Sequence, residues 1–102
     1  MDLSLTYRAL SSSQVDLIAG NSTDGLIAAL DLFQLADDRR YFPPYQAVFV
    51  ARLEKSEILN ETFQRLNGAI STEEMRRLNY EVVGDKRAPK DAAGDWIKQK
   101  GF

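Results

Sequence analysis

Hydrophobic residues at the start of the chain have first the spacing of a helix and then the density of a strand. Leu3, Tyr7 and Leu10 recur at i, i+4 and i+7, on one face of a short helix that the serines at 11–13 end. The next run, VDLIA at 15–19, is short, rich in branched residues and bounded by a glycine. It therefore predicts a strand.

A helix and a second short strand follow. Ser22 or Thr23 is suited to cap the helix, and Asp24 would lie in its first turn, where a carboxylate complements the positive end of the helix dipole. The apolar stripe of this helix consists of Leu26, Ile27 and Leu30. The run LFQLA at 32–36 predicts the second strand.

The run AVFVA at 47–51 is apolar without alternation, as expected for a strand covered by helices on both faces. It is the third predicted strand, and it follows a corner of two prolines and a tyrosine at 43–45. Between the second strand and this corner, Asp37-Asp38-Arg39-Arg40 is typical of a solvated turn.

The second half of the chain has the spacing of helices. An apolar stripe predicts a helix over 54–70, and Ser71-Thr72-Glu73-Glu74 is a capping box that begins the next helix. Pro89 suits the first turn of a last helix, which Gly101 can close and which buries Trp96. With three short strands and about five helices, the chain is predicted to be α/β.

Composition narrows the range of possible functions. The chain has 102 residues, 44% of them hydrophobic and 27% charged, as in an ordinary globular domain. Its net charge of −2 argues against nucleic acid as a partner, because binding phosphates requires a basic face. It contains no histidine and no cysteine, which removes the commonest general base, the commonest metal ligand and the thiol nucleophile. We therefore expect that the chain is not an enzyme and that it holds no metal ion and no cofactor.

Three segments together resemble a known family. They are the stretch 5–52, LTYRALSSSQVDLIAGNSTDGLIAALDLFQLADDRRYFPPYQAVFVAR, then ISTEEMRRLNYEV at 70–82 and AAGDWIKQKGF at 92–102. The combination of an STDG turn, a DD turn, an FPPY corner and an EEMRRLNYEV helix is similar to the C-terminal part of the substrate-binding proteins of quaternary-amine ABC transporters. The resemblance extends over essentially the whole chain, whereas the chain corresponds to well under half of a family member.

The resemblance implies part of a two-lobed, type II periplasmic-binding-protein fold. Residues 1–43 would form the C-terminal part of lobe two, and residues 44–102 the hinge crossover and the return into lobe one. Two prolines fix φ and resist helix formation, which suits the FPPY corner to a strut between moving lobes. The implied partners are a quaternary ammonium solute, such as glycine betaine, carnitine or choline, and an ABC permease subunit. The implied location is the periplasm or the extracytoplasmic face of the membrane, although the chain carries no recognisable signal sequence.

The resemblance also implies the site. A quaternary ammonium group is held by the faces of aromatic rings, each worth about 0.5–2 kcal/mol. Tyr45 matches one cage tyrosine, and it would face the loop of Asn21, Ser22 and Thr23 across the cleft. Asn21 is a departure from the family, because an aromatic residue normally precedes the STDG turn.

Other interpretations remain open. Tyr45 and its aromatic neighbours at 41–42 also suit core or hinge packing, and Ser22 and Thr23 also suit a simple helix cap. The chain as a whole would then be a truncated α/β interaction module without ligand binding, an alternative that Asn21 favours. Since each lobe would be incomplete, we further expect a homo-oligomer or domain-swapped dimer that covers exposed edges and apolar faces.

Overall fold

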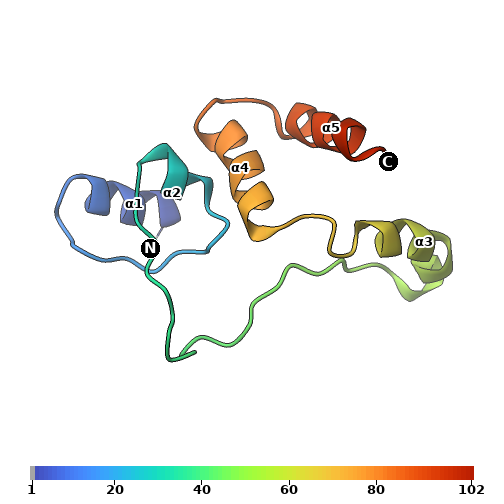
Figure 1. Ribbon diagram of the computed structural model, residues 1–102, viewed down its shortest axis with the longest axis horizontal. Helices are drawn as coiled ribbons and strands as arrows, with labels where there is room; N and C mark the ends of the chain where they lie inside the picture. Colours follow the sequence, from blue (N-terminus) through green and yellow to red (C-terminus); the bar gives the residue numbers. More distant parts are fainter. Residues whose placement is uncertain (1) are drawn as a thin grey trace. The chain divides into compact units, whose positions relative to one another are not determined.

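The computed structural model describes residues 2–102, and all of their regular structure is helical (Figure 1). In chain order the elements are α1 (Leu3–Ser11), α2 (Gly25–Ala29), the 3-10 turn η1 (Leu53–Lys55), α3 (Ser56–Leu66), α4 (Thr72–Val83) and α5 (Pro89–Lys100). The chain divides into two compact units. Unit 1 comprises residues up to Gln34 together with Thr72–Phe102, and unit 2 comprises Leu35–Ser71.

The predicted helices are confirmed. α1 begins after Asp2, whose carboxylate accepts the Ser4 N–H at 3.0 Å as an N-cap does. α4 begins directly after Ser71, as the capping box predicts. α5 has Pro89 in its first turn, and it ends at Gly101, whose φ of 78° is the left-handed conformation that glycine adopts without strain. The helix predicted over 54–70 is shorter, because a 3-10 turn replaces its start and α3 ends at Leu66.

The three predicted strands are wrong for this chain, and with them the α/β class. Residues 15–19, 32–36 and 47–51 adopt no regular structure. A strand requires hydrogen bonds to a neighbouring strand. Within residues 2–102 the only backbone bond to any of these runs is from the Leu32 N–H to the carbonyl of Ile27, which belongs to the end of α2. The apolar pattern of a run indicates which of its side chains would be buried in a sheet, but it does not show whether a neighbouring strand is present.

The packing of α2 on α4 dominates unit 1. Gly25 lies so close to α4 that a Cβ at this position would be 2.6 Å from the Asn79 carbonyl carbon and 2.7 Å from its oxygen. Only glycine therefore permits this approach. The small core of unit 1 contains Tyr7 and Trp96, which are 3% and 5% exposed; the predicted burial of Trp96 is confirmed.

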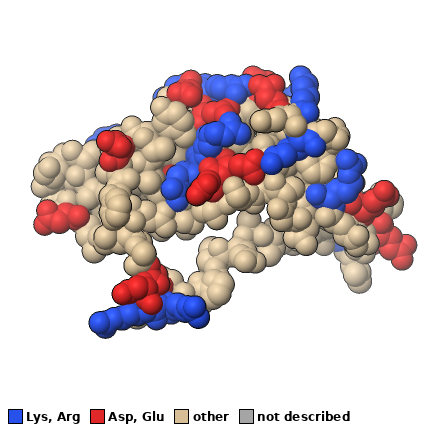
Figure 2. Space-filling view, viewed as in Figure 1, with Lys and Arg blue, Asp and Glu red and all other residues tan. Residues whose placement is uncertain are grey.

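Ion pairs join α4 to α5. The Arg87 guanidinium bridges Glu81 of α4 and Asp95 of α5, with 2.6 Å to the Asp95 carboxylate. Lys100 near the end of α5 lies 2.8 Å from Glu74 in the first turn of α4. Basic and acidic side chains are accordingly mixed on the face shown in Figure 2, rather than gathered into areas of one sign.

Unit 2 has almost no core of its own. None of residues 35–71, all of which the structure describes, is buried. Its clearest internal contact is the stacking of Phe49 on Phe63 of α3, with ring centroids 4.7 Å apart and planes 8° from parallel. The predicted solvated turn is confirmed: Asp37 accepts the N–H groups of Tyr41 and Phe42, each at 2.9 Å, and these hydrogen bonds lower the pKa of its carboxyl group.

The close approach at Gly25 generates a prediction about stability. Gly25→Ala should lower the free energy of unfolding by about 1–3 kcal/mol, because the new methyl group overlaps the backbone of α4. Gly94 in α5 is the matched control, since a Cβ there meets no atom within 4 Å. Gly94→Ala should raise the free energy of unfolding by about 0.5–1 kcal/mol. Urea denaturation followed by circular dichroism measures both, and effects of the same sign would contradict the description of this contact.

Candidate functional site

The loop that enters α2 differs from its predicted form. Asp24 itself occupies the N-cap position of α2, so it does not lie in the first turn, and neither Ser22 nor Thr23 is the cap. The Asp24 side chain makes no capping hydrogen bond to the helix. Its carboxylate instead accepts hydrogen bonds from two groups outside α2. The loop is therefore held by these bonds and not by a side-chain cap.

Asp24 Oδ2 accepts two hydrogen bonds. The Tyr7 hydroxyl of α1 donates one at 2.7 Å, and the Asn21 backbone N–H donates the other at 2.9 Å. Gly20 makes room for this arrangement, because a Cβ there would lie 2.6 Å from the Tyr7 hydroxyl oxygen. Tyr7, predicted only as an apolar face residue of the first helix, therefore ties α1 to the loop.

Two side chains of α4 hold the other side of the loop. Arg76 Nε donates to the Ser22 carbonyl at 2.7 Å, and Asn79 Nδ2 donates to the Thr23 carbonyl at 2.8 Å. Ser22 and Thr23 thus contribute backbone oxygens to the fold, while the side chains of Asn21 and Ser22 are exposed and that of Thr23 is half-buried. Sequence analysis missed Arg76 and Asn79. The available signal was their spacing of three in RRLN, which places two polar side chains on one face of α4.

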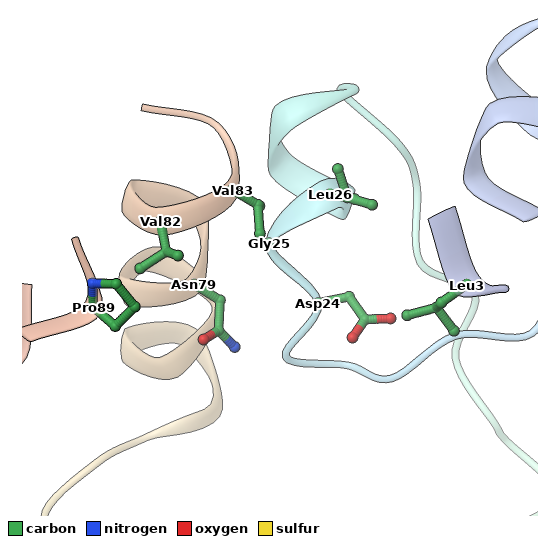
Figure 3. A pocket seen from close by; sticks show the side chains of 8 residues that line it. All are labelled: Leu3, Asp24, Gly25, Leu26, Asn79, Val82, Val83 and Pro89. Atoms are coloured by element: carbon green, nitrogen blue, oxygen red, sulfur yellow. The ribbon is translucent and has the colours of Figure 1, made fainter. Parts of the chain in front are cut away.

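A shallow hollow of about 290 Å³ lies beside this loop (Figure 3). Figure 3 shows Asp24 on the loop that enters α2 and Asn79 on the facing part of α4. The remaining walls come from Leu3, Gly25, Leu26, Val82, Val83 and Pro89. The hollow therefore combines one carboxylate and one amide with apolar walls, and none of the predicted site residues lines it.

Tyr45 belongs to unit 2 and is 94% exposed. Core packing of this ring is therefore excluded within the described chain. Its neighbours Tyr41 and Phe42 contact each other edge to face, with centroids 5.2 Å apart, and both remain largely exposed. Both faces of the Tyr45 ring are thus accessible from solvent. Tyr45 and the Asn21–Thr23 loop belong to different units, and the pairing of the two stays a prediction.

A metal site and a membrane-spanning helix are both absent from the described residues. In the part of the chain from residue 2 onward, no group of three or more acidic side chains is arranged to hold a metal ion. Over the same residues, no helix has the length and apolar character needed to cross a bilayer.

A family model described as the substrate-binding domain of ABC-type glycine betaine transport systems matches residues 1–99. The chain belongs to this family. The resemblance stated from the STDG, FPPY and EEMRRLNYEV motifs is therefore confirmed. Since members of the glycine betaine substrate-binding family bind solutes for transport, the expectation that the chain is not an enzyme is confirmed as well.

Individual relatives show how much of a family member the chain represents. It is 40% identical over 105 residues to the carnitine transport binding protein OpuCC of Listeria monocytogenes, covering 100% of this chain and 34% of the relative. It is 36% identical to the ergothioneine transport permease/ergothioneine binding protein EgtU of Helicobacter pylori, covering 100% of this chain and 19% of that protein. A glycine-betaine-binding protein of Pseudomonas aeruginosa is 32% identical, with 97% and 33% covered.

A solved structure also matches the chain. The crystal structure of a glycine betaine/carnitine/choline ABC transporter matches 97% of this chain and 37% of its own, with a TM-score of 0.80 and 44% identity. The chain spans about a third of the length of the binding proteins that it matches. The absence of a sheet among residues 2–102 is therefore compatible with membership of the family, because two thirds of a relative lie outside the match.

The bond between Tyr7 and Asp24 generates a prediction about pH. Burial of the phenol, together with the adjacent Asp24 carboxylate, raises the pKa of Tyr7 from 10.0 to about 12. Because the folded state holds the proton more tightly than the unfolded state, this contribution to stability is complete below about pH 10 and is lost as the pH rises toward 12. NMR titration of ring-labelled tyrosine should show a late transition that is absent in Tyr7→Phe. Ionisation of Tyr7 near pH 10 would contradict the arrangement.

Proposed function

We propose that this chain contributes part of the ligand-binding unit of an ABC importer for quaternary ammonium solutes. Its family is named for glycine betaine, and the names of its relatives and of the similar crystal structure add carnitine, ergothioneine and choline. These solutes share a positively charged nitrogen with no N–H group. A binding site for them must therefore use surfaces other than ordinary hydrogen-bond acceptors.

The observation that carries the proposal is the free ring of Tyr45. A quaternary ammonium group is attracted to the negative face of an aromatic ring, at about 0.5–2 kcal/mol for each ring depending on desolvation. Tyr45 follows two prolines that restrict the backbone, and it is 94% exposed. Such a ring offers both of its faces to a ligand, and the two prolines limit the conformations of the backbone that carries it, as one wall of an aromatic cage requires.

The second wall is the loop of Asn21, Ser22 and Thr23. Its backbone is fixed from inside by Arg76, Asn79 and Asp24, whereas the side chains of Asn21 and Ser22 are exposed. Asn21 offers an amide where the family resemblance leads us to expect an aromatic ring. We therefore propose a ligand whose polar end, a carboxylate or hydroxyl group, lies on this side, and whose ammonium group lies on the Tyr45 side.

The complete site needs more polypeptide than this chain. Unit 2 has no buried residue, and Val48 and Val50 are 78% and 91% exposed. Side chains of this kind contribute to stability only once they are covered. We propose that the remainder of a two-lobed fold covers them, with residues 1–43 in lobe two, residues 44–102 leading through the FPPY hinge into lobe one, and docking to a permease on the extracytoplasmic side.

Two alternatives use the same exposed segment differently. A second copy of the chain, in a homo-oligomer or domain-swapped dimer, would cover the apolar residues of unit 2 without any additional polypeptide. An interaction module without ligand binding would use them to contact another protein. Calorimetry separates the interaction module from the proposed function, because only a solute-binding unit is expected to give a heat of binding on addition of an amine. A homo-oligomer is consistent with either function, and its mass in solution identifies it.

The proposed role of Tyr45 predicts a selective loss of affinity. The test protein is a chimera in which this chain replaces the matching segment of the Listeria relative. By isothermal titration calorimetry, Tyr45→Ala should weaken binding of the preferred amine among glycine betaine, carnitine and choline by about 2- to 30-fold, the equivalent of one cation–π contact. Tyr45→Phe should retain most of the affinity, because it keeps the ring.

The matched control is Tyr41→Ala, which removes another exposed tyrosine from the same segment and should leave affinity unchanged. Circular dichroism establishes that each chimera is folded. A folded chimera that produces no heat with any of the three amines would favour the interaction module, and equal losses in Tyr45→Ala and Tyr41→Ala would remove Tyr45 from the site.

A further inference from the structure

Three side chains converge on the backbone of the loop before α2. Asp24 accepts the N–H of Asn21, Arg76 donates to the carbonyl of Ser22, and Asn79 donates to the carbonyl of Thr23. A side chain thus holds one backbone group of each of the three successive loop residues. Because the bonds involve the backbone, the side chains of these three residues can vary without changing how the loop is held.

Arg76 has a second partner. Its Nη2 donates to Gln34 Oε1 at 2.6 Å, while its Nε donates to the Ser22 carbonyl at 2.7 Å. The guanidinium is a rigid planar fork, so the two acceptors are held at a fixed separation. Gln34 is the last residue of unit 1 before the segment that carries Tyr45. One side chain therefore anchors both the Asn21–Thr23 loop and the point where the chain leaves unit 1.

We propose that Arg76 is a positioning residue that couples the Asn21–Thr23 loop to the start of the Tyr45 segment, with Asn79 and Asp24 fixing the loop at its other backbone groups. The link to ligand binding rests on the proposed function of this loop. Arg76 itself does not contact the ligand. It holds the Asn21–Thr23 loop, which is one proposed wall of the site. It also holds Gln34, after which the segment that carries Tyr45, the other proposed wall, begins.

Arg77 provides a matched comparison on the same helix. It is the next residue, it carries the same charge, and it pairs with Glu81 of α4 rather than with the loop. Arg76→Ala and Arg77→Ala therefore remove equal charge from adjacent positions of α4. Only the first removes hydrogen bonds to Ser22 and Gln34.

The test is amide hydrogen exchange of the 102-residue chain, measured residue by residue by NMR. The N–H groups of Asn21 and Asp24 both take part in hydrogen bonds within the loop, so their exchange reports how often it opens. In Arg76→Ala both should exchange about tenfold faster or more, as expected for loss of hydrogen bonds from a charged donor. In Arg77→Ala both should exchange at the wild-type rate.

Gln34→Glu keeps the test decisive if Arg76→Ala does not fold. This substitution replaces the amide oxygen that accepts from Arg76 with a carboxylate oxygen, which forms a stronger hydrogen bond with a guanidinium group. The N–H groups of Asn21 and Asp24 should therefore exchange more slowly than in the wild type. Unchanged exchange in Gln34→Glu, or equal exchange in Arg76→Ala and Arg77→Ala, would overturn the proposed coupling.

The effect of these substitutions on amine binding is measured in a separate experiment. In the Listeria chimera, Arg76→Ala should weaken amine binding severalfold, because the binding-competent loop is populated less of the time, and Arg77→Ala should not. If the unsubstituted chimera binds none of the amines while the exchange results are as expected, the proposed function fails and the coupling stands. If the chimera binds but exchange in Arg76→Ala equals that in Arg77→Ala, the coupling fails and the proposed function stands.

Discussion

The contact between the start of α2 and one face of α4 organises the part of the chain that folds around a core. Gly25 lets the two backbones approach, and the adjacent loop then lies within reach of the polar side chains of α4. Tyr7 completes the arrangement from α1 through Asp24. A helix of five residues has little stability of its own, so α2 exists because this packing holds it.

Unit 2, by contrast, is not organised around a buried core. Residues 47–51 have the composition of a buried central strand, yet they make no backbone hydrogen bonds and their valines are exposed. Phe49 finds a partner in Phe63, which anchors the segment to α3. Relatives carry about twice as much chain outside the match as within it, and we propose that polypeptide of this kind covers the segment.

Much of the helical structure was predictable from the sequence, and the reasons are local. The start of α4 after Ser71, the proline in the first turn of α5 and the closing glycine at 101 all follow from rules that involve only neighbouring residues. The strands at 15–19, 32–36 and 47–51 were wrong because a strand depends on a partner that periodicity cannot supply. Within the site, Arg76 and Asn79 escaped prediction because their acceptors in the loop, the carbonyls of Ser22 and Thr23, lie more than fifty residues away in sequence and belong to the backbone, which no sequence pattern reveals.

The proposed function depends most on contact between the Tyr45 ring and the ammonium group of a bound solute. The most direct measurement is an intermolecular NOE experiment on the Listeria chimera with ring-labelled tyrosine and saturating amine. The account predicts cross-peaks between the N-methyl protons of the ligand and the Tyr45 ring protons, identified by their loss in Tyr45→Phe when only tyrosine is labelled. Cross-peaks to other tyrosines with none to Tyr45, at full occupancy of the ligand, would contradict it.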